Sequence, residues 1–557
     1  MQINLMLLFV FYWLLIFSCL GYGILITRLL KEKNNIINLG YVGLIGILSL
    51  IIYSYLSNFF YPHTQIHNLI LILLGLVLFI FNLIKESYKK RKIINLLTIF
   101  LILFISFIIF KPHDDFSYYH FQYSHHLTQY PLIIGIGQFN HGYATQSSIF
   151  YLNSLFFLPL IKYSFFHISV LLVFGFSNLI LIEKLFNYLK KNKPNYLSFY
   201  LLLSFSFINI IFYRLAEHGT DRSAQILVFL LVFELILLIN NRKNFNNAIA
   251  RIFILLSLII SFKAFYILYF LFLLIVIYYG YKKFNLNFLF LLFQNKFFWF
   301  LAITFALVVT TNFFNSGCLL FPVKFTCFYD MPWSFSYNHV VHMGNWYEQW
   351  SKAGAGPNFR VENVEEYLIF FNWFSNWIEQ YFFNKVHDFL LGLLLIIFVF
   401  FLFFCSLKIK KKISTDIIFP IYLFLIILFL EWIYNHPALR YGGFVLIGLL
   451  LFIPSSFLFE KFSKENIINR IKIIFVIIIV IFTFRNILRI NNEIKKYNFN
   501  PLINAHYRFD QKYLQIHKEI EYLINNYISC SKYEKCDENA DIKVGKRFGK
   551  FYFINEQ

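Results

Sequence analysis

The chain has 557 residues, of which 59% are hydrophobic and only 14% are charged. A soluble globular protein carries about 25% charged residues, so this composition excludes the soluble class. The formal charge of +21 does not indicate nucleic-acid binding, because the basic residues form short clusters between apolar runs instead of one contiguous basic face. The composition therefore predicts an all-α, polytopic transmembrane helical bundle.

The first apolar run, Leu5–Leu30, has no basic segment before it and is followed by Lys31, Glu32 and Lys33. We interpret it as a transmembrane helix with its N-terminus outside, not as a cleaved signal peptide. The same criterion, about 20 apolar residues per crossing, predicts about fourteen spans along the chain. They are 4–28, 36–58, 66–84, 93–110, 163–183, 196–213, 224–241, 250–262, 264–281, 298–314, 388–407, 415–434, 441–459 and 470–488.

We divide the chain into N-terminal helices at 1–92, a transmembrane core at 93–488 and a C-terminal segment at 489–557. Basic clusters such as Lys408–Lys412 are typical of cytoplasmic loops. All 15 His fall in or beside the opposite segments, which include 111–162, 315–387 and the C-terminal segment. The alternation predicts a multi-pass membrane protein with these segments in the periplasm.

The close pairs Cys318/Cys327 and Cys530/Cys536 lie in the segments predicted to be periplasmic. Paired cysteines in an oxidising compartment indicate disulfides, and free thiols are the alternative. Neither pair has the two further ligands that a zinc site needs, so we predict no metal.

One apolar run, 250–281, is interrupted only by Lys263. A charge at the bilayer centre is costly, so we expect two short helices with Lys263 at the turn between them. One long tilted helix is the alternative.

An acidic pair, Asp114 and Asp115, follows directly after the helix predicted to end at Phe110. Repulsion and partial desolvation raise the pKa of one carboxyl toward the range of a general base. Adjacent side chains point in different directions, so only one is expected to face a substrate. The alternative role is a helix N-cap. Beyond Tyr118 and His120 we predict one helix, a glycine-rich turn and a second helix over 147–161, both on the membrane surface.

A second polar cluster occupies the short turn from Arg214 to Arg222 and includes Glu217, His218 and Asp221. A helix terminator at Gly219 and an N-cap at Asp221 explain part of this sequence without any function. That explanation does not cover Glu217 and His218, which we keep as substrate-binding candidates.

Two basic residues stand alone at predicted helix ends, Lys263 and Arg440. Such cations suit a phosphate group. The alternative is that their side chains extend to lipid head groups. In the segment 315–387, Trp333, Trp346 and Trp350 occur among glycines and polar residues. This mixture suits a carbohydrate site, although interfacial anchoring is the commoner role of tryptophan.

The acidic motif Asp114-Asp115-Phe116-Ser117-Tyr118, after a membrane helix and before a long loop, resembles the GT-C superfamily of integral-membrane glycosyltransferases. The resemblance implies a GT-C-like core, Asp114 as catalytic base with Asp115 beside it, and a polyprenyl-phosphate-linked sugar donor. Lys263 and Arg440 would contact the donor phosphate. The chain departs from the simplest pattern, with four helices ahead of the motif instead of one.

Most of the chain also resembles an uncharacterised family of bacterial membrane proteins. The shared motifs lie at 114–120, 217–221, 315–318 and 437–442. This second resemblance implies kinship and no particular activity. The GT-C resemblance implies a glycosyltransferase at the outer face of a bacterial inner membrane. It would move a sugar onto a surface polysaccharide or lipid acceptor, with Tyr118, His120, Glu217, His218 and Asp221 around the substrates. No cofactor and no nucleic-acid partner is expected, and membrane lipids surround the bundle. A flippase of lipid-linked saccharides and a glycan polymerase or ligase are the alternatives.

Overall fold

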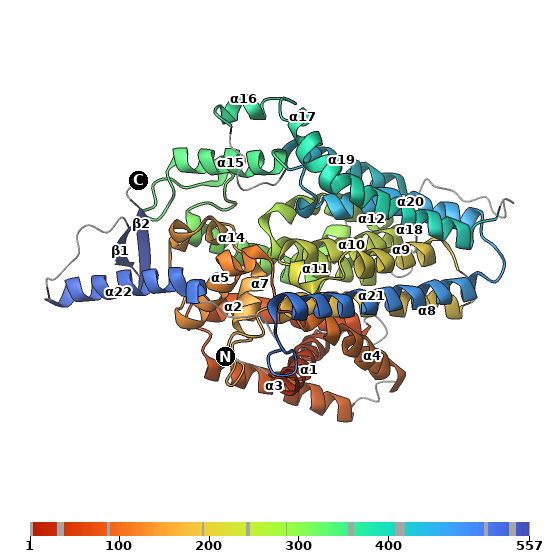
Figure 1. Cartoon of the computed structure of the whole chain (residues 1–557), viewed down its shortest axis with the longest axis horizontal. Helices are drawn as coiled ribbons and strands as arrows, with labels where there is room; N and C mark the ends of the chain where they lie inside the picture. The colour runs from red at the N-terminus through yellow and green to blue at the C-terminus, as the bar shows by residue number, and fades with distance from the viewer. Residues whose placement is uncertain are drawn as a thin grey trace.

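The computed structural model describes residues 4–30, 38–85, 90–191, 194–240, 245–285, 287–354, 361–406, 418–505, 511–533, 542–547 and 549–555. Most of them are helical, and several long helices, among them α8, α9 and α21, run roughly from side to side in Figure 1. Several basic clusters predicted to be cytoplasmic, including Lys408–Lys412, lie outside the described residues.

Each of the predicted spans has a helical counterpart. Eleven helices are long and apolar enough to cross a membrane, α9 and α19 are apolar but shorter, and α4 begins with three basic residues. The counterparts are α1 (Leu5–Leu29), α2 (Leu39–Asn58), α3 (Gln65–Lys85), α4 (Lys90–Phe107), α8 (Ile168–Lys190), α9 (Tyr196–Ile210), α10 (Asp221–Asn240), α11 (Phe245–Phe262), α12 (Phe272–Phe284), α14 (Lys296–Ser316), α18 (His387–Phe404), α19 (Phe419–Asn435), α20 (Gly443–Lys461) and α21 (Ile467–Tyr497). The polytopic helical class is therefore confirmed.

The other described helices lie between these spans or follow the last of them. They are η1 (Phe116–His120), α5 (Phe121–Gln129), η2 (Ile136–Phe139), α6 (His141–Ala144), α7 (Ser148–Ser154), η3 (Leu215–Glu217), η5 (Ala264–Leu271), α13 (Asn287–Gln294), η6 (Lys324–Thr326), α15 (Tyr337–Lys352), α16 (Val364–Leu368), α17 (Phe374–Trp377), η7 (Ile378–Val386), η9 (Leu439–Tyr441), η10 (Gln511–Leu514) and α22 (Gln515–Tyr533). We call the end of the bundle formed by residues 111–162 and 315–387 the loop end.

The segment 111–162 differs from the prediction of two helices on the membrane surface. Residues 121–128 of α5 are all buried, and so are all residues of α7, because both helices pack inside the protein, against each other and against α2 or α22. The second helix was expected to reach Ile161 but ends at Ser154. A tight turn stops it, in which Leu158 and Lys162 exchange backbone hydrogen bonds across Pro159.

The disulfide predicted between Cys318 and Cys327 is present. It closes a short loop that packs beneath α15 beside Ala144. Cys530 is disulfide-bonded, whereas its predicted partner, Cys536, lies outside the described residues.

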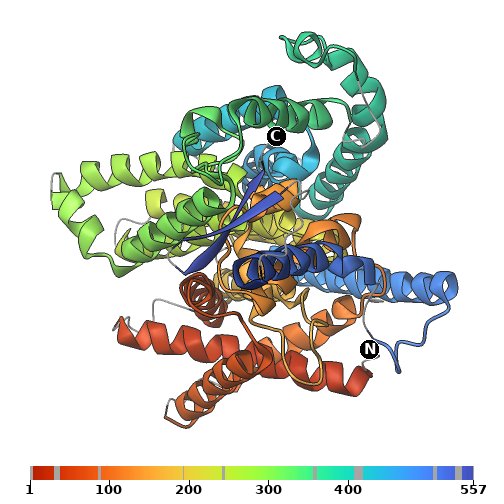
Figure 2. The same ribbon diagram turned by 90° about the vertical axis from the view of Figure 1, so that its left-hand side faces the viewer.

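The C-terminal segment packs onto the loop end. Its antiparallel hairpin joins β1 (Ile542–Arg547) to β2 (Lys550–Asn555) and is the only sheet among the described residues. Ile134 donates a backbone hydrogen bond to Phe551 and accepts one from Phe553. Figure 2, which faces the loop end, shows the hairpin in front of the centre of the bundle. Strand pairing therefore fixes the end of the chain against the segment 111–162.

The interruption of the apolar run at Lys263 is a true break. The helix α11 ends at Phe262, Lys263 has an extended backbone, and the 3-10 helix η5 begins at Ala264. The prediction of two helices with Lys263 between them is therefore confirmed. The break places the ammonium group of Lys263 at the loop end, close to the first residue of α10.

Candidate functional site

Four charged side chains from distant parts of the sequence meet at the loop end. We call them the charge cluster: Asp115, Asp221, Lys263 and Arg440. Lys263 Nζ lies 2.6 Å from Asp221 Oδ1. Arg440 donates from Nη2 to Asp115 at 2.9 Å and from Nε to Asp221 at 3.3 Å. One guanidinium thus connects two carboxylates, and Asp221 connects the two cations.

Each member of the charge cluster stands at the end of a helical element. Asp115 immediately precedes η1, a π-helix, a form often found at functional sites. Asp221 is the first residue of α10. Arg440 lies in η9, which ends at Gly442 with a positive φ of 107° that suits glycine. Gln225 secures this turn, because its side chain donates to the carbonyl of Arg440 and accepts from the backbone of Val445.

Aromatic rings surround the cations of the charge cluster. The guanidinium of Arg440 lies 5.3 Å from the ring centre of Trp350 and 5.5 Å from that of Tyr441. The ammonium of Lys263 lies 4.7 Å from the same tyrosine ring. These are cation–π distances, so the rings hold both cations in place without neutralising them.

We expected one carboxyl of the acidic pair to have a raised pKa, but the pKa of Asp115 is lowered. Burial by itself raises the pKa of Asp115, but the guanidinium of Arg440 and the nearby His113 outweigh it and hold the pKa well below its usual range. Asp115 is therefore an ionised partner of Arg440 in this state. The side chains of Asp115 and Arg440 remain 31% and 34% exposed, so a ligand has access to both.

Asp114 lies apart from the charge cluster. Its side chain is 96% exposed, and its carboxylate lies 3.7 Å from the ammonium of Lys111. The alternative of an N-cap is not seen at Asp115, whose side chain makes no capping hydrogen bond. Of the acidic pair, the structure therefore directs Asp115 toward Arg440 and Asp114 toward solvent.

Glu217 and His218 serve the turn that carries them. Glu217 lies 2.7 Å from Arg214 and 2.9 Å from Arg222, both in the same turn. His218 is buried, and its Nε2 lies 2.6 Å from the carbonyl oxygen of Phe212. Burial lowers the pKa of His218 to about 3, so the imidazole is neutral. These contacts hold the turn that precedes Asp221, and they do not join the charge cluster.

The predicted residues Tyr118 and His120 lie beside the charge cluster. His120 is buried 4.9 Å from the ring of His113, and burial lowers the pKa of both imidazoles. A Cβ at Gly219 would come within 3.4 Å of both rings, so the turn before Asp221 packs directly on this histidine pair. Tyr118 is half exposed, with its ring 5.5 Å from that of His141. Among the described residues, no group of three or more His, Cys, Asp or Glu is arranged to hold a metal.

An apolar groove of about 540 Å³ opens between η7, α18, α19 and α20. Two of its wall residues support the turn that carries Arg440. Trp377 donates its indole N–H to the carbonyl of Pro437, and Trp432 donates to that of Ala438. The groove therefore shares two wall residues with the support of the Arg440 turn, and it is lined by side chains such as Phe382, Leu390 and Ile447.

Sequence reasoning missed three residues of this site: Gln225, Tyr441 and the role of Trp350. Gln225 lies one helical turn after Asp221, so the spacing alone places both on one face of α10. Tyr441 directly follows Arg440 in the chain. Trp350 was interpreted as an interfacial anchor, and no local signal shows that it packs on Arg440.

Residues 6–447 match a protein family described as a domain of unknown function (DUF8201). This region contains every member of the charge cluster. No curated protein and no solved structure matches the chain. The chain is thus a polytopic helical membrane protein that belongs to the DUF8201 family.

Proposed function

We propose that the protein is a membrane-embedded glycosyltransferase that moves a sugar from a polyprenyl-phosphate donor to a glycan or lipid acceptor. The observation that carries the proposal is that the turn bearing Arg440 accepts hydrogen bonds from two tryptophans in the wall of the apolar groove. Lys263 and Arg440 both contact Asp221, so two cations stand together near this turn. A lipid phosphate has the matching shape, with an anionic head beside a long apolar chain.

The donor phosphate would bind at Arg440 and Lys263. A guanidinium presents paired N–H donors that match phosphate oxygens, and a lysine adds a point charge. Asp221 stays between the two cations and fixes their spacing. Asp115 holds Arg440 by a single 2.9 Å contact at a partly exposed position, so an incoming phosphate competes for the same guanidinium.

This competition supplies a base. Once phosphate takes the guanidinium, Asp115 loses the charge that lowers its pKa, while the burial that raises the pKa remains. The carboxylate then accepts the proton of the acceptor hydroxyl as its oxygen bonds to the sugar carbon. The bond from that carbon to the phosphate oxygen breaks, and this oxygen keeps the electron pair. Arg440, which binds the phosphate, stabilises the negative charge that results. The proposal thus assigns the base to Asp115, whereas the GT-C resemblance favoured its neighbour.

The apolar groove supports a lipid-linked donor over a soluble nucleotide sugar. Its wall is made of aromatic and aliphatic side chains from helices apolar enough to lie in a membrane, such as α18 and α20. A hydrocarbon chain in this groove would add favourable burial of about 0.8 kcal/mol for each CH₂ group. A nucleotide would bury polar groups there without partners.

We further propose that the loop end faces the periplasm of a bacterial inner membrane. The disulfide Cys318–Cys327 at this end supports an oxidising compartment. Labelling of engineered cysteines in intact cells tests the orientation. A membrane-impermeant thiol reagent should modify Glu366→Cys, at an exposed position of α16, and leave exposed Lys282→Cys at the far end of α12 unmodified. The opposite pattern would reject the orientation.

The transfer reaction is tested with purified protein in lipid nanodiscs and a polyprenyl-phosphate hexose carrying a radiolabelled sugar. The expected result is label in a saccharide or glycolipid product, lost in Asp115→Asn at equal protein. Proteoliposomes distinguish the transport alternative with the same labelled donor. Movement of intact donor across the bilayer, with no cleavage of the sugar–phosphate bond, would replace the transferase by a flippase.

A further inference from the structure

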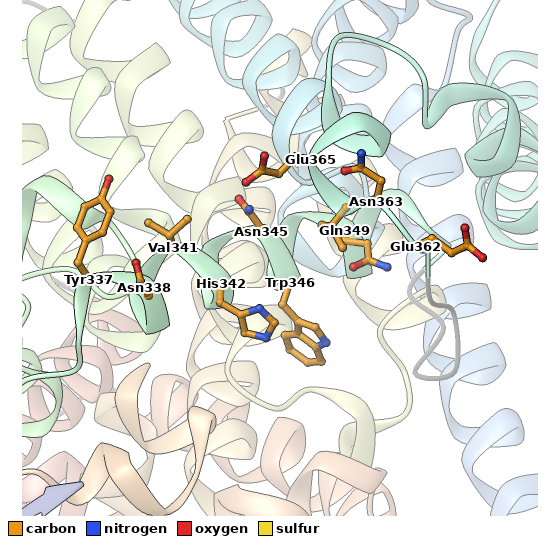
Figure 3. Close-up of a pocket in the computed structure, with 11 residues that line it drawn as sticks. Tyr337, Asn338, Val341, His342, Asn345, Trp346, Gln349, Glu362, Asn363 and Glu365 are labelled. Atoms are coloured by element: carbon orange, nitrogen blue, oxygen red, sulfur yellow. The ribbon is translucent and has the colours of Figure 1, made fainter. Parts of the chain in front are cut away.

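A second hollow lies at the loop end, away from the charge cluster and the apolar groove. It has a volume of about 330 Å³ and is formed by α15 together with residues 362–365. Figure 3 shows side chains from both elements turned toward this space, among them Asn345 from α15 and Glu365 from the second element. The volume falls at the lower end of the range of roughly 300–1,000 Å³ that small-molecule sites occupy.

The described lining of the hollow is polar, and its one basic side chain is that of His342. Amides come from Asn338, Asn345, Gln349 and Asn363, and carboxylates come from Glu362 and Glu365. An amide offers both donors and acceptors, and a carboxylate only accepts. This set matches hydroxyl groups, which donate and accept. It does not match a phosphate or another anion, because the described wall residues include no Lys or Arg, and Glu362 and Glu365 would repel the charge.

Trp346 gives the hollow an aromatic wall. The C–H face of a sugar ring packs well on an indole, whose body is apolar and whose N–H is a polar handle. A site with one aromatic plate and several amides is therefore suited to a neutral saccharide. The same plate with acidic neighbours alone would suit a cation instead, but here amides outnumber carboxylates.

The hollow and the charge cluster share the helix α15. The ring of Trp346 lies 5.4 Å from that of His141, which in turn lies 5.5 Å from Tyr118 in the segment that carries Asp115. One turn further along α15, Trp350 packs on the guanidinium of Arg440. Residues four apart lie on the same side of a helix, so one face of α15 carries Trp346 at the hollow and Trp350 at the charge cluster.

We propose that this hollow binds a neutral glycan and is the acceptor subsite of the protein. Saccharide binding follows from the lining alone, whereas the name acceptor rests on the proposed transfer reaction. A chain of sugar units held on Trp346 would extend along α15 toward His141 and Tyr118, and would bring its terminal hydroxyl to Asp115. The donor phosphate and the acceptor would then approach the charge cluster from different elements, the first from α19 and α20 and the second from α15.

Saturation-transfer NMR on the full chain in nanodiscs tests the binding, with maltotriose, mannotriose and chitotriose as probes. At least one trisaccharide should receive magnetisation, and Trp346→Ala should weaken its affinity about tenfold or more, which corresponds to 1.4 kcal/mol. The matched control is Trp299→Ala, which removes an exposed tryptophan of α14 that lies outside the hollow. The double variant Asn345→Ala, Glu365→Ala removes polar contacts without touching the aromatic wall and should also weaken binding.

The outcomes separate this inference from the proposed function. The glycan site would be overturned if none of the three trisaccharides received magnetisation from the protein. It would also be overturned if the parent, Trp346→Ala and the double variant bound the trisaccharide with equal affinity. Sugar transfer that depends on Asp115 with an acceptor KM unchanged by Trp346→Ala would overturn the site and leave the transferase standing. Trisaccharide binding that requires Trp346, in a protein that transfers no sugar, would retain the site and reject the transferase.

Discussion

Two groups of charged residues lie near opposite ends of the helix pair α10 and α11, and they differ in what surrounds them. The charge cluster is at the loop end, where Asp221 begins α10 and Lys263 follows α11. The second group, which we call the enclosed cluster, lies deeper: Glu234, Arg251, Lys184 and the hydroxyl of Tyr41. Glu234 lies 2.7 Å from Arg251 and 3.5 Å from Lys184.

The enclosed cluster is sealed by the bundle. Glu234 and Tyr41 are fully buried, and the helices α2, α8, α10 and α11 enclose them. Its carboxylate is held by two cations and a hydroxyl, so it can exchange none of them for a ligand. The charge cluster instead has a partly exposed guanidinium shared between two acids. A buried ion network stabilises one packing of the helices, whereas an accessible one can exchange a partner for substrate.

The largest effect is expected on turnover when Asp115 is changed. Asp115→Asn keeps the shape and removes the base, so the rate of sugar transfer should fall about 10²–10⁴-fold. The matched control is Asp114→Asn, which alters the adjacent, solvent-exposed carboxyl and should keep near-parental turnover. Product is measured in nanodiscs at equal protein. A large loss in Asp114→Asn with a small one in Asp115→Asn would reverse the assignment made here.

A substitution in the enclosed cluster should lower the stability of the fold. Glu234→Gln removes the carboxylate that contacts the buried Arg251 and the partly buried Lys184, and breaking such a buried pair costs about 3–5 kcal/mol. Thermal unfolding in detergent should therefore show a large drop in melting temperature. Asp115→Asn, the comparison variant from the charge cluster, should have a melting temperature close to that of the parent. Equal melting temperatures for Glu234→Gln and the parent would remove the distinction between the clusters.

Donor affinity should depend on the two cations of the charge cluster. Arg440→Ala and Lys263→Ala should each weaken binding of polyprenyl phosphate by about 1.5–3 kcal/mol, the value of a hydrogen bond to a charged group. Arg440→Lys keeps the positive charge but loses the paired N–H donors. Its affinity for polyprenyl phosphate should therefore lie between those of the parent and Arg440→Ala. Native mass spectrometry measures the bound lipid, and polyprenol, which lacks the phosphate, is the control ligand. Unchanged phosphate affinity in both alanine variants would exclude the role.

The smallest expected effect is a difference between two pH profiles. In the free protein, Arg440 keeps the pKa of Asp115 well below its usual range, so kcat/KM should stay flat into the acidic range. In the donor complex the phosphate occupies Arg440 and the pKa of Asp115 rises. The acidic limb of kcat should then lie about 1–3 pH units above that of kcat/KM, the shift attributed to an adjacent arginine. Coincident limbs would show that phosphate does not displace Asp115.

The sequence by itself determined the helices and the end of the bundle to which each polar segment belongs. A chain in lipid must satisfy its backbone internally, so apolar runs of about 20 residues predict helices with little ambiguity. Alternation along the chain then places Asp115, Asp221, Lys263 and Arg440 at one end, as the structure has them. The break at Lys263 and the disulfide Cys318–Cys327 were also predictable, because the cost of a buried charge and the pairing of close cysteines are local properties.

Only the tertiary structure decided which side chains meet. The sequence does not show which residue of the acidic pair faces the site. The direction of the Asp115 side chain depends on the π-helical turn and on Arg440, 325 residues away. Glu217 and His218 stood out in the sequence, yet both bond within their own turn. The pKa of Asp115 is lowered instead of raised because a guanidinium from another helix outweighs burial. These features depend on contacts between segments far apart in the sequence, and a local sequence pattern does not show which distant segments will meet.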